Sequence, residues 1–88
     1  MNNERGETMQ LSQAVQKRII KICKENNISL NGLSEKSNLP TSTVYSIYYG
    51  KSKDPKLSTI LAICEGCNMN LTDFFDDKTF KRDKLNDL

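Results

Sequence analysis

Apolar residues recur at three- and four-residue steps along most of the chain, which is the spacing of amphipathic helices. The first run comprises Leu11, Val15, Ile19, Ile22 and Cys23. The other faces of the same segment carry Lys17, Arg18, Lys21 and Lys24. Asn26 and Asn27 then suit the end of a helix, so the pattern predicts a first helix from about residue 11 to residue 26.

A second, shorter helix is predicted to begin after Ser29, whose side chain can cap it. Ile28 and Leu33 stand at the outer and inner positions of a hydrophobic staple. Gly32 lies inside this helix and costs it up to about 1 kcal/mol relative to alanine. We therefore expect the helix to rely on tertiary packing, or to need a close backbone approach at Gly32.

A sharp turn and a third helix follow. Asn38 tolerates the left-handed conformation that a chain reversal needs. Pro40 disfavours helix in the residue before it but suits a first helical turn, so the third helix should begin near residue 40 or 41. Val44 and Ile47 would face inward, and Gly50 would end the helix.

Two further helices complete the expected all-α fold. After a loop at residues 51–56, helical spacing returns at Leu57, Ile60, Leu61, Ile63 and Cys64. Asn70 and Asp73 resemble a capping pair that opens a short fifth helix, whose Phe74 and Phe75 are expected to close the core.

The division of the chain follows from these patterns. Residues 1–10 are polar and aperiodic and are interpreted as a flexible N-terminal arm, residues 11–76 as one helical domain and residues 77–88 as a charged C-terminal tail. No apolar run of about 18 residues is present, so neither a membrane span nor a signal peptide is predicted. We expect a cytoplasmic protein with no membrane partner and no separate small-molecule ligand domain.

Basic residues are concentrated in the middle of the chain, although the net charge of the whole chain is only +2. Residues 17–56 hold eight Lys and Arg against three acidic residues, a balance of +5, and the remainder sums to −3. This polarity indicates a polyanionic partner for one region, although charge runs are more often solvated faces.

The outer side of the predicted third helix carries hydroxyl groups. If Val44 and Ile47 face the core, the opposite side holds Thr41, Ser42, Tyr45, Ser46 and Tyr49. Hydroxyls can donate to and accept from base edges, and Thr methyls and Tyr rings can touch the thymine methyl in the major groove. Ordinary solvent exposure is the alternative interpretation. The adjacent Tyr48 and Tyr49 favour a binding surface, because they cannot both be core residues.

The chemistry of this helix limits its specificity. It has no Arg, Gln or Asn for bidentate base pairs, so modest specificity or reliance on DNA shape is expected. Phosphate contacts are expected from Lys51, Lys53 and Lys56 in the following loop. The starts of the second and third helices, at Ser29, Asn31 and Thr43, would add further phosphate contacts.

These residues together resemble the phage-repressor type of helix-turn-helix, also called XRE or Cro-like, over residues 11–76. The matching apolar positions are Leu33, Leu39, Val44 and Ile47, with a small residue at Ser34, a glycine at Gly50 and a proline loop at Asp54-Pro55. Leu57 to Cys64 and Leu71 to Phe75 look like the fourth and fifth helices of the family. Asn38 stands where a glycine is usual, Pro40 where Ser or Thr is usual, and Leu30 where a polar residue is common.

The resemblance implies a five-helix lambda-repressor-like DNA-binding domain that acts on double-stranded DNA as a transcriptional regulator, a repressor of the XRE type. The third helix would enter the major groove, with base contacts from Thr41, Ser42, Tyr45 and Ser46. Phosphate contacts would come from the first turn of the second helix and from Lys51 and Lys53. Family members usually bind inverted repeats as homodimers, and Phe75, Phe80 and Leu85 are the candidate dimer residues, with Ile20 as another.

Three other functions were weighed. Cys64 and Cys67 have the spacing of a thiol pair, but a zinc site needs four ligands and the chain has three cysteines and no histidine, so no metal and no cofactor is expected. Catalysis is not expected, because no base stands near a serine to activate it. An antitoxin-like or adaptor module that uses the same fold to bind a protein remains the alternative function.

Overall fold

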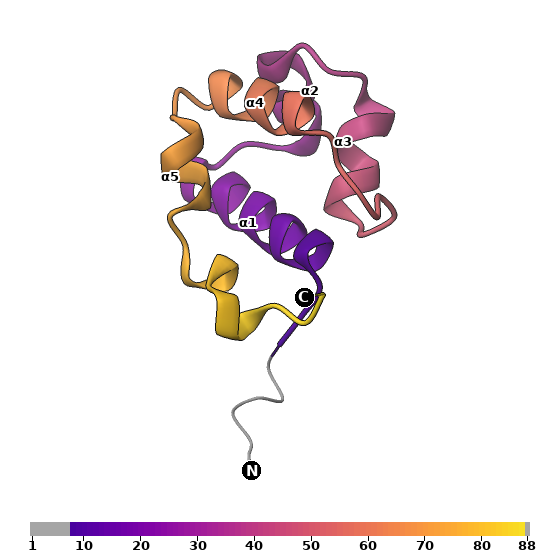
Figure 1. The fold of residues 1–88 in the computed structure, drawn as a ribbon. Helices are drawn as coiled ribbons and strands as arrows, with labels where there is room; N and C mark the ends of the chain where they lie inside the picture. Colours follow the sequence, from indigo (N-terminus) through magenta and orange to yellow (C-terminus); the bar gives the residue numbers. More distant parts are fainter. Residues whose placement is uncertain (1–7, 88) are drawn as a thin grey trace.

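The computed structural model describes residues 8–87, in which helices follow one another with short connections (Figure 1). In chain order the elements are α1 (Leu11–Asn26), α2 (Leu30–Ser37), α3 (Thr41–Tyr48), α4 (Leu57–Gly66), α5 (Leu71–Phe75) and the 3₁₀ turns η2 (Lys78–Phe80) and η3 (Arg82–Lys84). Across residues 8–87 the only β-type pairing is an isolated bridge between Met9 and Leu85. The predicted all-α fold with five helices is confirmed. Most of the expected N-terminal arm, residues 1–7, and Leu88 lie outside the described residues.

The predicted helix ends are confirmed at the asparagines. Asn27, Asn38 and Asn68 follow α1, α2 and α4 with φ values of 54°, 56° and 58°, in the left-handed region. Asparagine occupies this region more readily than other non-glycine residues, because its short polar side chain can bond locally. Three of the five helices are therefore followed by a left-handed asparagine, and at each of these points the chain turns sharply toward the next helix (Figure 1).

The α2–α3 pair is built as the sequence predicts. Ser29 Oγ accepts a hydrogen bond of 3.0 Å from the backbone N–H of Gly32, which caps α2. At the other end of α2, the backbone N–H of Leu39 donates to the Ser34 carbonyl at 3.1 Å, and the Ser34 hydroxyl donates to the Leu39 carbonyl. These bonds fasten the turn between the two helices, so the angle between α2 and α3 is set by the backbone.

One apolar core joins the five helices. Its fully buried members come from every helix, and the largest are Phe74, Ile19, Ile22, Leu33, Ile63, Val44 and Cys64. Leu39 and Tyr48 pack against this cluster from the turn and from α3. Not every apolar residue of the helical pattern is buried: Leu57 is 71% exposed and Leu61 43% exposed, because they lie on the side of α4 away from Ile60, Ile63 and Cys64.

The close backbone approach lies at Gly66 and not at Gly32. A Cβ atom on Gly66 would stand 2.8 Å from the carbonyl carbon and oxygen of Lys36 and from Ser37 Oγ. A Cβ atom on Gly32 would meet only Ser29 Oγ, at 3.2 Å. The absence of a side chain at Gly66 thus lets α4 pack directly on the end of α2.

Arg18 is buried, which corrects its expected place on an outer face of α1. Its Nε donates to the carbonyl of Phe74 at 2.6 Å and its Nη2 to the carbonyl of Asp73 at 2.7 Å. The guanidinium group lies 5.8 Å from the centre of the Phe74 ring. Arg18 therefore donates to the carbonyl groups at the end of α5, where a helix leaves acceptors without intrahelical donors.

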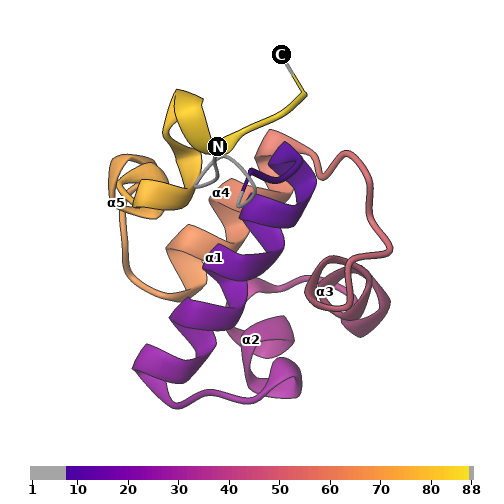
Figure 2. The same cartoon turned by 90° about the horizontal axis from the view of Figure 1, so that it is seen from below.

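The segment after α5 folds back along α1 (Figure 2). Asp77 Oδ2 accepts from Lys21 Nζ at 2.9 Å and lies 3.9 Å from Arg18 Nη1. At the other end of the segment, the backbone N–H of Leu11 donates to Asp87 Oδ1 at 2.7 Å. Residues 77–87, which the sequence suggests as a charged tail, are thus tied to both ends of the N-terminal half of α1.

The three cysteines are free, with Cys23 and Cys64 buried and Cys67 half-buried. Burial raises the pKa of all three thiols, so a reactive thiolate is disfavoured at neutral pH. In the described range, no helix has the length and apolar character required to cross a membrane.

Candidate nucleic-acid interface

The face of α3 opposite the core is open to solvent. Val44 and Ile47 are buried, whereas Thr41 and Ser42 are exposed and Tyr45 is 40% exposed. Ser46 and Thr43 are half-buried at the edge of this face. The helix therefore presents hydroxyl groups and aromatic rings on a surface that a groove of DNA can reach, as its 3.6-residue period predicts.

Aromatic contacts hold the C-terminal end of this face. Tyr48 packs against the core, and Tyr49 is 59% exposed. The Tyr49 ring meets Tyr48 edge-on, with centroids 5.1 Å apart, and lies 5.9 Å from the Tyr45 ring. Tyr45 and Tyr49 thus form an exposed aromatic pair in contact with the half-buried ring of Tyr48, so their positions are restricted before any ligand binds.

The loop after α3 is fastened to the helix. Gly50 has a φ of 76°, in the left-handed region that glycine adopts without strain. The backbone N–H groups of Lys51 and Ser52 then donate to the carbonyl of Ser46 at 2.8 Å and 3.1 Å. These bonds fix the backbone of Lys51 against α3, while the side chains of Lys51, Lys53 and Lys56 extend into solvent.

A shallow hollow of about 450 Å³ lies between α3 and this loop. Its lining is rich in hydroxyl groups: Ser42, Thr43, Ser46, Ser52 and Thr59. Lys56 and Asp54 contribute one charge of each sign. Ser52 and Thr59 were not predicted as site residues, because nothing in their sequence spacing brings the loop and α4 beside α3.

The start of α2 offers a second set of donors. Ser29 and Asn31 are both exposed. Because Ser29 Oγ accepts the cap bond from Gly32, its hydroxyl proton remains available as a donor. The first N–H groups of a helix have no intrahelical partner, so the backbone at Asn31 can also donate outward.

Comparison with known protein families decides the assignment. The family model of the Cro/C1-type HTH DNA-binding domain matches residues 18–79. The chain belongs to this family. Neither the curated proteins nor the solved structures contain a significant match to it. The resemblance drawn from the sequence is therefore confirmed, and with it the helix-turn-helix formed by α2 and α3.

The positive charge of this Cro/C1-type domain is less available than the sequence count indicates. Arg18 is buried against α5, and Lys21 pairs with Asp77. Both contribute to the excess of basic residues between positions 17 and 56. The exposed cations of the loop next to α3 are Lys51, Lys53 and Lys56, and Asp54 in the same loop offsets one of their charges.

The candidate dimer residues have unequal exposure. Phe80 is half-buried and meets Phe75 edge-on, with ring centroids 4.9 Å apart. Leu85 is half-buried beside its bridge partner Met9. Phe75 is the more exposed of the aromatic pair. It lines a groove of about 140 Å³ together with Leu11 and Leu57, two apolar residues of the helical patterns that predict α1 and α4. Leu61 and Leu71 are also exposed, one turn further along α4 and one turn earlier on α5.

Proposed function

We propose that this Cro/C1-type domain is a transcriptional repressor that inserts α3 into the major groove of its operator. The observation that carries the proposal is the exposed hydroxyl and tyrosine face of α3, held at its end by the bonds from Lys51 and Ser52 to the Ser46 carbonyl. A helix in the major groove reads bases with the side chains on its outer face.

The proposed roles differ between the two parts of the interface. Thr41, Ser42, Tyr45, Ser46 and Tyr49 contact bases. Ser29, Asn31, Thr43, Lys51, Lys53 and Lys56 contact phosphates. Because the base-reading set lacks bidentate donors, most of the affinity comes from phosphate contacts and is strongly salt-dependent. The half-buried position of Ser46 and Thr43 makes them the least accessible members of the two sets.

A homodimer would place two copies of α3 in successive major grooves, about one helical turn apart. Such a dimer on an operator that overlaps a promoter would block the polymerase, which is the basis of the proposed repressor role. We propose that the groove formed by Leu11, Leu57 and Phe75 lies at the dimer interface, with Phe80 supporting Phe75 from behind.

Selection of binding sites from random duplex DNA tests this function. The wild-type protein is expected to enrich a short inverted repeat, with affinity that falls steeply as salt rises. Tyr45→Ala should change the enriched bases, whereas Lys51→Ala should weaken all sequences about equally and lower the salt slope by roughly one.

Lys81→Ala is the matched control for Lys51→Ala, because Lys81 is an exposed lysine in the C-terminal segment, outside the candidate interface. It should leave the salt slope unchanged. If the wild type enriches no sequence and binds DNA without salt dependence, the proposed function is wrong. If Tyr45→Ala and Lys51→Ala have the same effect, the division between base and phosphate contacts is wrong.

A further inference from the structure

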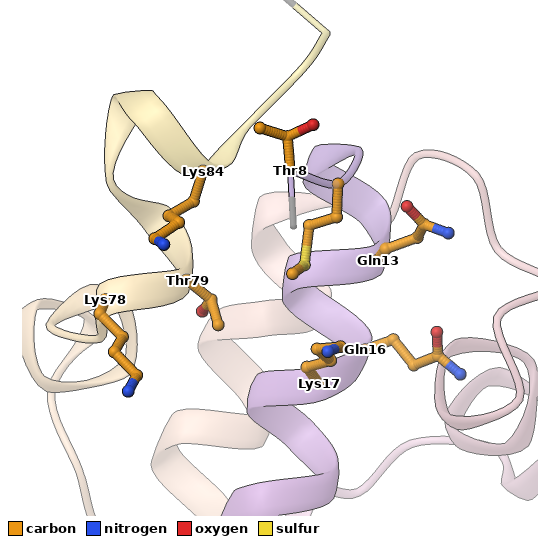
Figure 3. A pocket seen from close by; sticks show the side chains of 8 residues that line it. Thr8, Gln13, Gln16, Lys17, Lys78, Thr79 and Lys84 are labelled. Atoms are coloured by element: carbon orange, nitrogen blue, oxygen red, sulfur yellow. The ribbon is translucent and has the colours of Figure 1, made fainter. Parts of the chain in front are cut away.

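A second hollow of about 560 Å³ lies on the other side of α1 from the core, between α1 and the C-terminal turns. Figure 3 shows Gln13, Gln16 and Lys17 along α1, Lys78, Thr79 and Lys84 along the C-terminal segment, and Thr8 near the start of α1. Met9 completes the lining. This volume is within the range of pockets that bind small molecules.

Hydrogen bonds outside the lining side chains join the two segments that form the pocket. The backbone N–H of Met9 donates to the carbonyl of Lys84 at 2.8 Å, and the N–H of Asn86 donates to the carbonyl of Met9 at 2.9 Å. Asp77 fastens the start of the segment to Lys21. The pocket is therefore formed by two segments that are already fixed to each other before a ligand binds.

The charge of the pocket has one sign. Three lysines line it, and the lining contains no carboxylate. Two acidic groups of the same segment are engaged elsewhere: Asp77 bonds to Lys21 and Thr79, and Asp87 accepts from the Leu11 N–H. Ion pairs found among residues 8–87 do not involve Lys17, Lys78 or Lys84. A concave site with several unneutralised cations attracts anions strongly.

We propose that this pocket binds a nucleotide-sized organic phosphate. Three ammonium groups around one hollow match a multiply charged phosphate better than a single carboxylate, and lysine binds phosphate as a point charge. The volume exceeds what inorganic phosphate fills, and Met9 offers a thioether to an aromatic base. Gln13, Gln16 and Thr8 complete the polar lining, and the Gln13 and Gln16 side chains extend from α1 away from the C-terminal segment (Figure 3).

Gln16 connects this pocket to the candidate DNA-binding helix. Its Nε2 donates to the carbonyl of Tyr48 at 2.8 Å, at the last residue of α3. A Cβ atom on Gly50 would lie 3.1 Å from Gln16 Oε1, so the same side chain also packs against the turn after α3. A ligand that contacts Gln16 thus acts on the end of α3. Only this effect on DNA binding rests on the proposed function, and binding to the pocket does not.

Titration of the full-length protein with ADP, followed by calorimetry and by amide chemical shifts, tests the proposal. ADP should bind with a salt-sensitive affinity and shift the amides of Thr8, Lys17 and Thr79. Adenosine, which lacks the phosphates, should not bind. The combined variant Lys78→Gln, Lys84→Gln should weaken ADP binding about tenfold or more, because two of the three cations are removed. Lys81→Gln, in the same segment but outside the lining, should leave ADP binding unchanged.

The opposite results overturn the proposal. These are no binding of ADP by the wild type, equal binding of adenosine and ADP, or equal weakening by Lys81→Gln and the combined variant. A chemical-shift map of the wild type centred away from Thr8, Lys17 and Thr79 also overturns it, and this readout does not depend on how the variants fold. If ADP does not bind and the combined variant loses DNA affinity, the lysines contact the DNA backbone and the pocket is not a ligand site. If ADP binds, but DNA affinity is the same with and without it, the coupling through Gln16 is wrong.

Discussion

At the scale of single residues, Asp77 is the most heavily bonded carboxylate described in this Cro/C1-type domain. Its Oδ1 accepts the backbone N–H of Thr79 at 3.0 Å and the hydroxyl of Thr79 at 2.9 Å, and its Oδ2 accepts from Lys21. The bond from the Thr79 backbone is the main reason why the pKa of Asp77 falls from 3.8 to about 2, with Lys21 adding to the effect.

This pKa predicts a pH-dependent stability. The ionised carboxylate stabilises the fold above its unfolded pKa of 3.8, and the contribution is lost as the pH falls through the folded pKa of about 2. We expect Asp77→Asn to lower the free energy of unfolding by about 1–2 kcal/mol at pH 7 and to have little effect near pH 2. Urea unfolding at both pH values measures the difference.

Asp76→Asn is the control, because Asp76 is the exposed neighbour of Asp77 in the same segment. Its effect should be small at either pH. A difference between wild type and Asp77→Asn that is equally large at pH 7 and pH 2 would contradict the role of the charge, and would indicate a loss of packing alone.

Gly66 provides a second prediction at this scale. Alanine is the better helix former, but a Cβ at this position would stand 2.8 Å from the backbone of Lys36, which cannot move as a side chain can. We expect Gly66→Ala to lower the free energy of unfolding by about 1–3 kcal/mol, as overpacking does elsewhere. Gly32→Ala, which meets only Ser29 Oγ, should change it by less than about 1 kcal/mol. Denaturant midpoints that rank the two variants in the reverse order would be incompatible with the close approach of α2 and α4.

The contrast between these glycines shows what single-residue reasoning can and cannot find. The sequence identifies Gly32 as a helix-weakening residue, and that remains correct for its local propensity. The need for glycine at position 66 depends on where α2 crosses α4, which no local pattern records. Arg18 was misplaced for the same reason: its partners are the carbonyl groups of Asp73 and Phe74, more than fifty residues along the chain.

At the scale of elements, local signals were sufficient to predict the fold. Ser29, Asn38, Pro40 and Gly50 mark the limits of α2 and α3, because each acts through bonds or dihedral angles of its own neighbours. The inward positions of Val44 and Ile47 follow from helical periodicity in the same way. The hollow beside α3 was not predicted, since Ser52 and Thr59 reach it through the path of a loop.

Substitutions of Asn38 test whether the left-handed backbone conformation in the turn between α2 and α3 is strained. Its φ of 56° and ψ of 43° are unfavourable for a residue with a Cβ and acceptable for glycine. We expect Asn38→Gly to be neutral or to raise the free energy of unfolding by a few tenths of a kcal/mol, and Asn38→Ala to lower it by about 1 kcal/mol. Asn31→Ala, an exposed substitution inside α2, controls for the loss of an amide side chain. Equal stability of the Gly and Ala variants at position 38 would argue against strain in this turn.

At the scale of the whole molecule, the described part of the chain has three surfaces of functional interest. The outer face of α3 and its loop form the candidate DNA interface, and the hollow between α1 and the C-terminal turns forms the candidate phosphate pocket. The apolar groove of Leu11, Leu57 and Phe75 adjoins the candidate DNA interface, because Lys53, Asp54 and Pro55 of the loop also line it. It brings together the starts of α1 and α4 and the end of α5, so only the assembled fold reveals it.

This groove leads to a prediction about assembly. Leu57 is 71% exposed, so its substitution removes little from the core of a monomer, whereas burial of such a side chain in a dimer contributes about 1.5–3 kcal/mol. We expect the combined variant Leu57→Ser, Phe75→Ser to shift a wild-type dimer toward monomer in light scattering across a dilution series. Because a dimer contacts both half-sites at once, the variant should also lose more affinity for the full inverted repeat than for a single half-site.

Tyr49→Ser is the matched control, since Tyr49 is a large side chain whose 59% exposure lies between those of Leu57 and Phe75, and it stands elsewhere, at the end of α3. It should weaken DNA binding without changing the molar mass. A wild type that is monomeric at every concentration and on DNA, or a combined variant with an unchanged molar mass, would remove the groove from the proposed interface. Phe80 would not serve as a substitute test, because it is half-buried against Phe74 and Phe75, and its loss would disturb the fold as well as the surface.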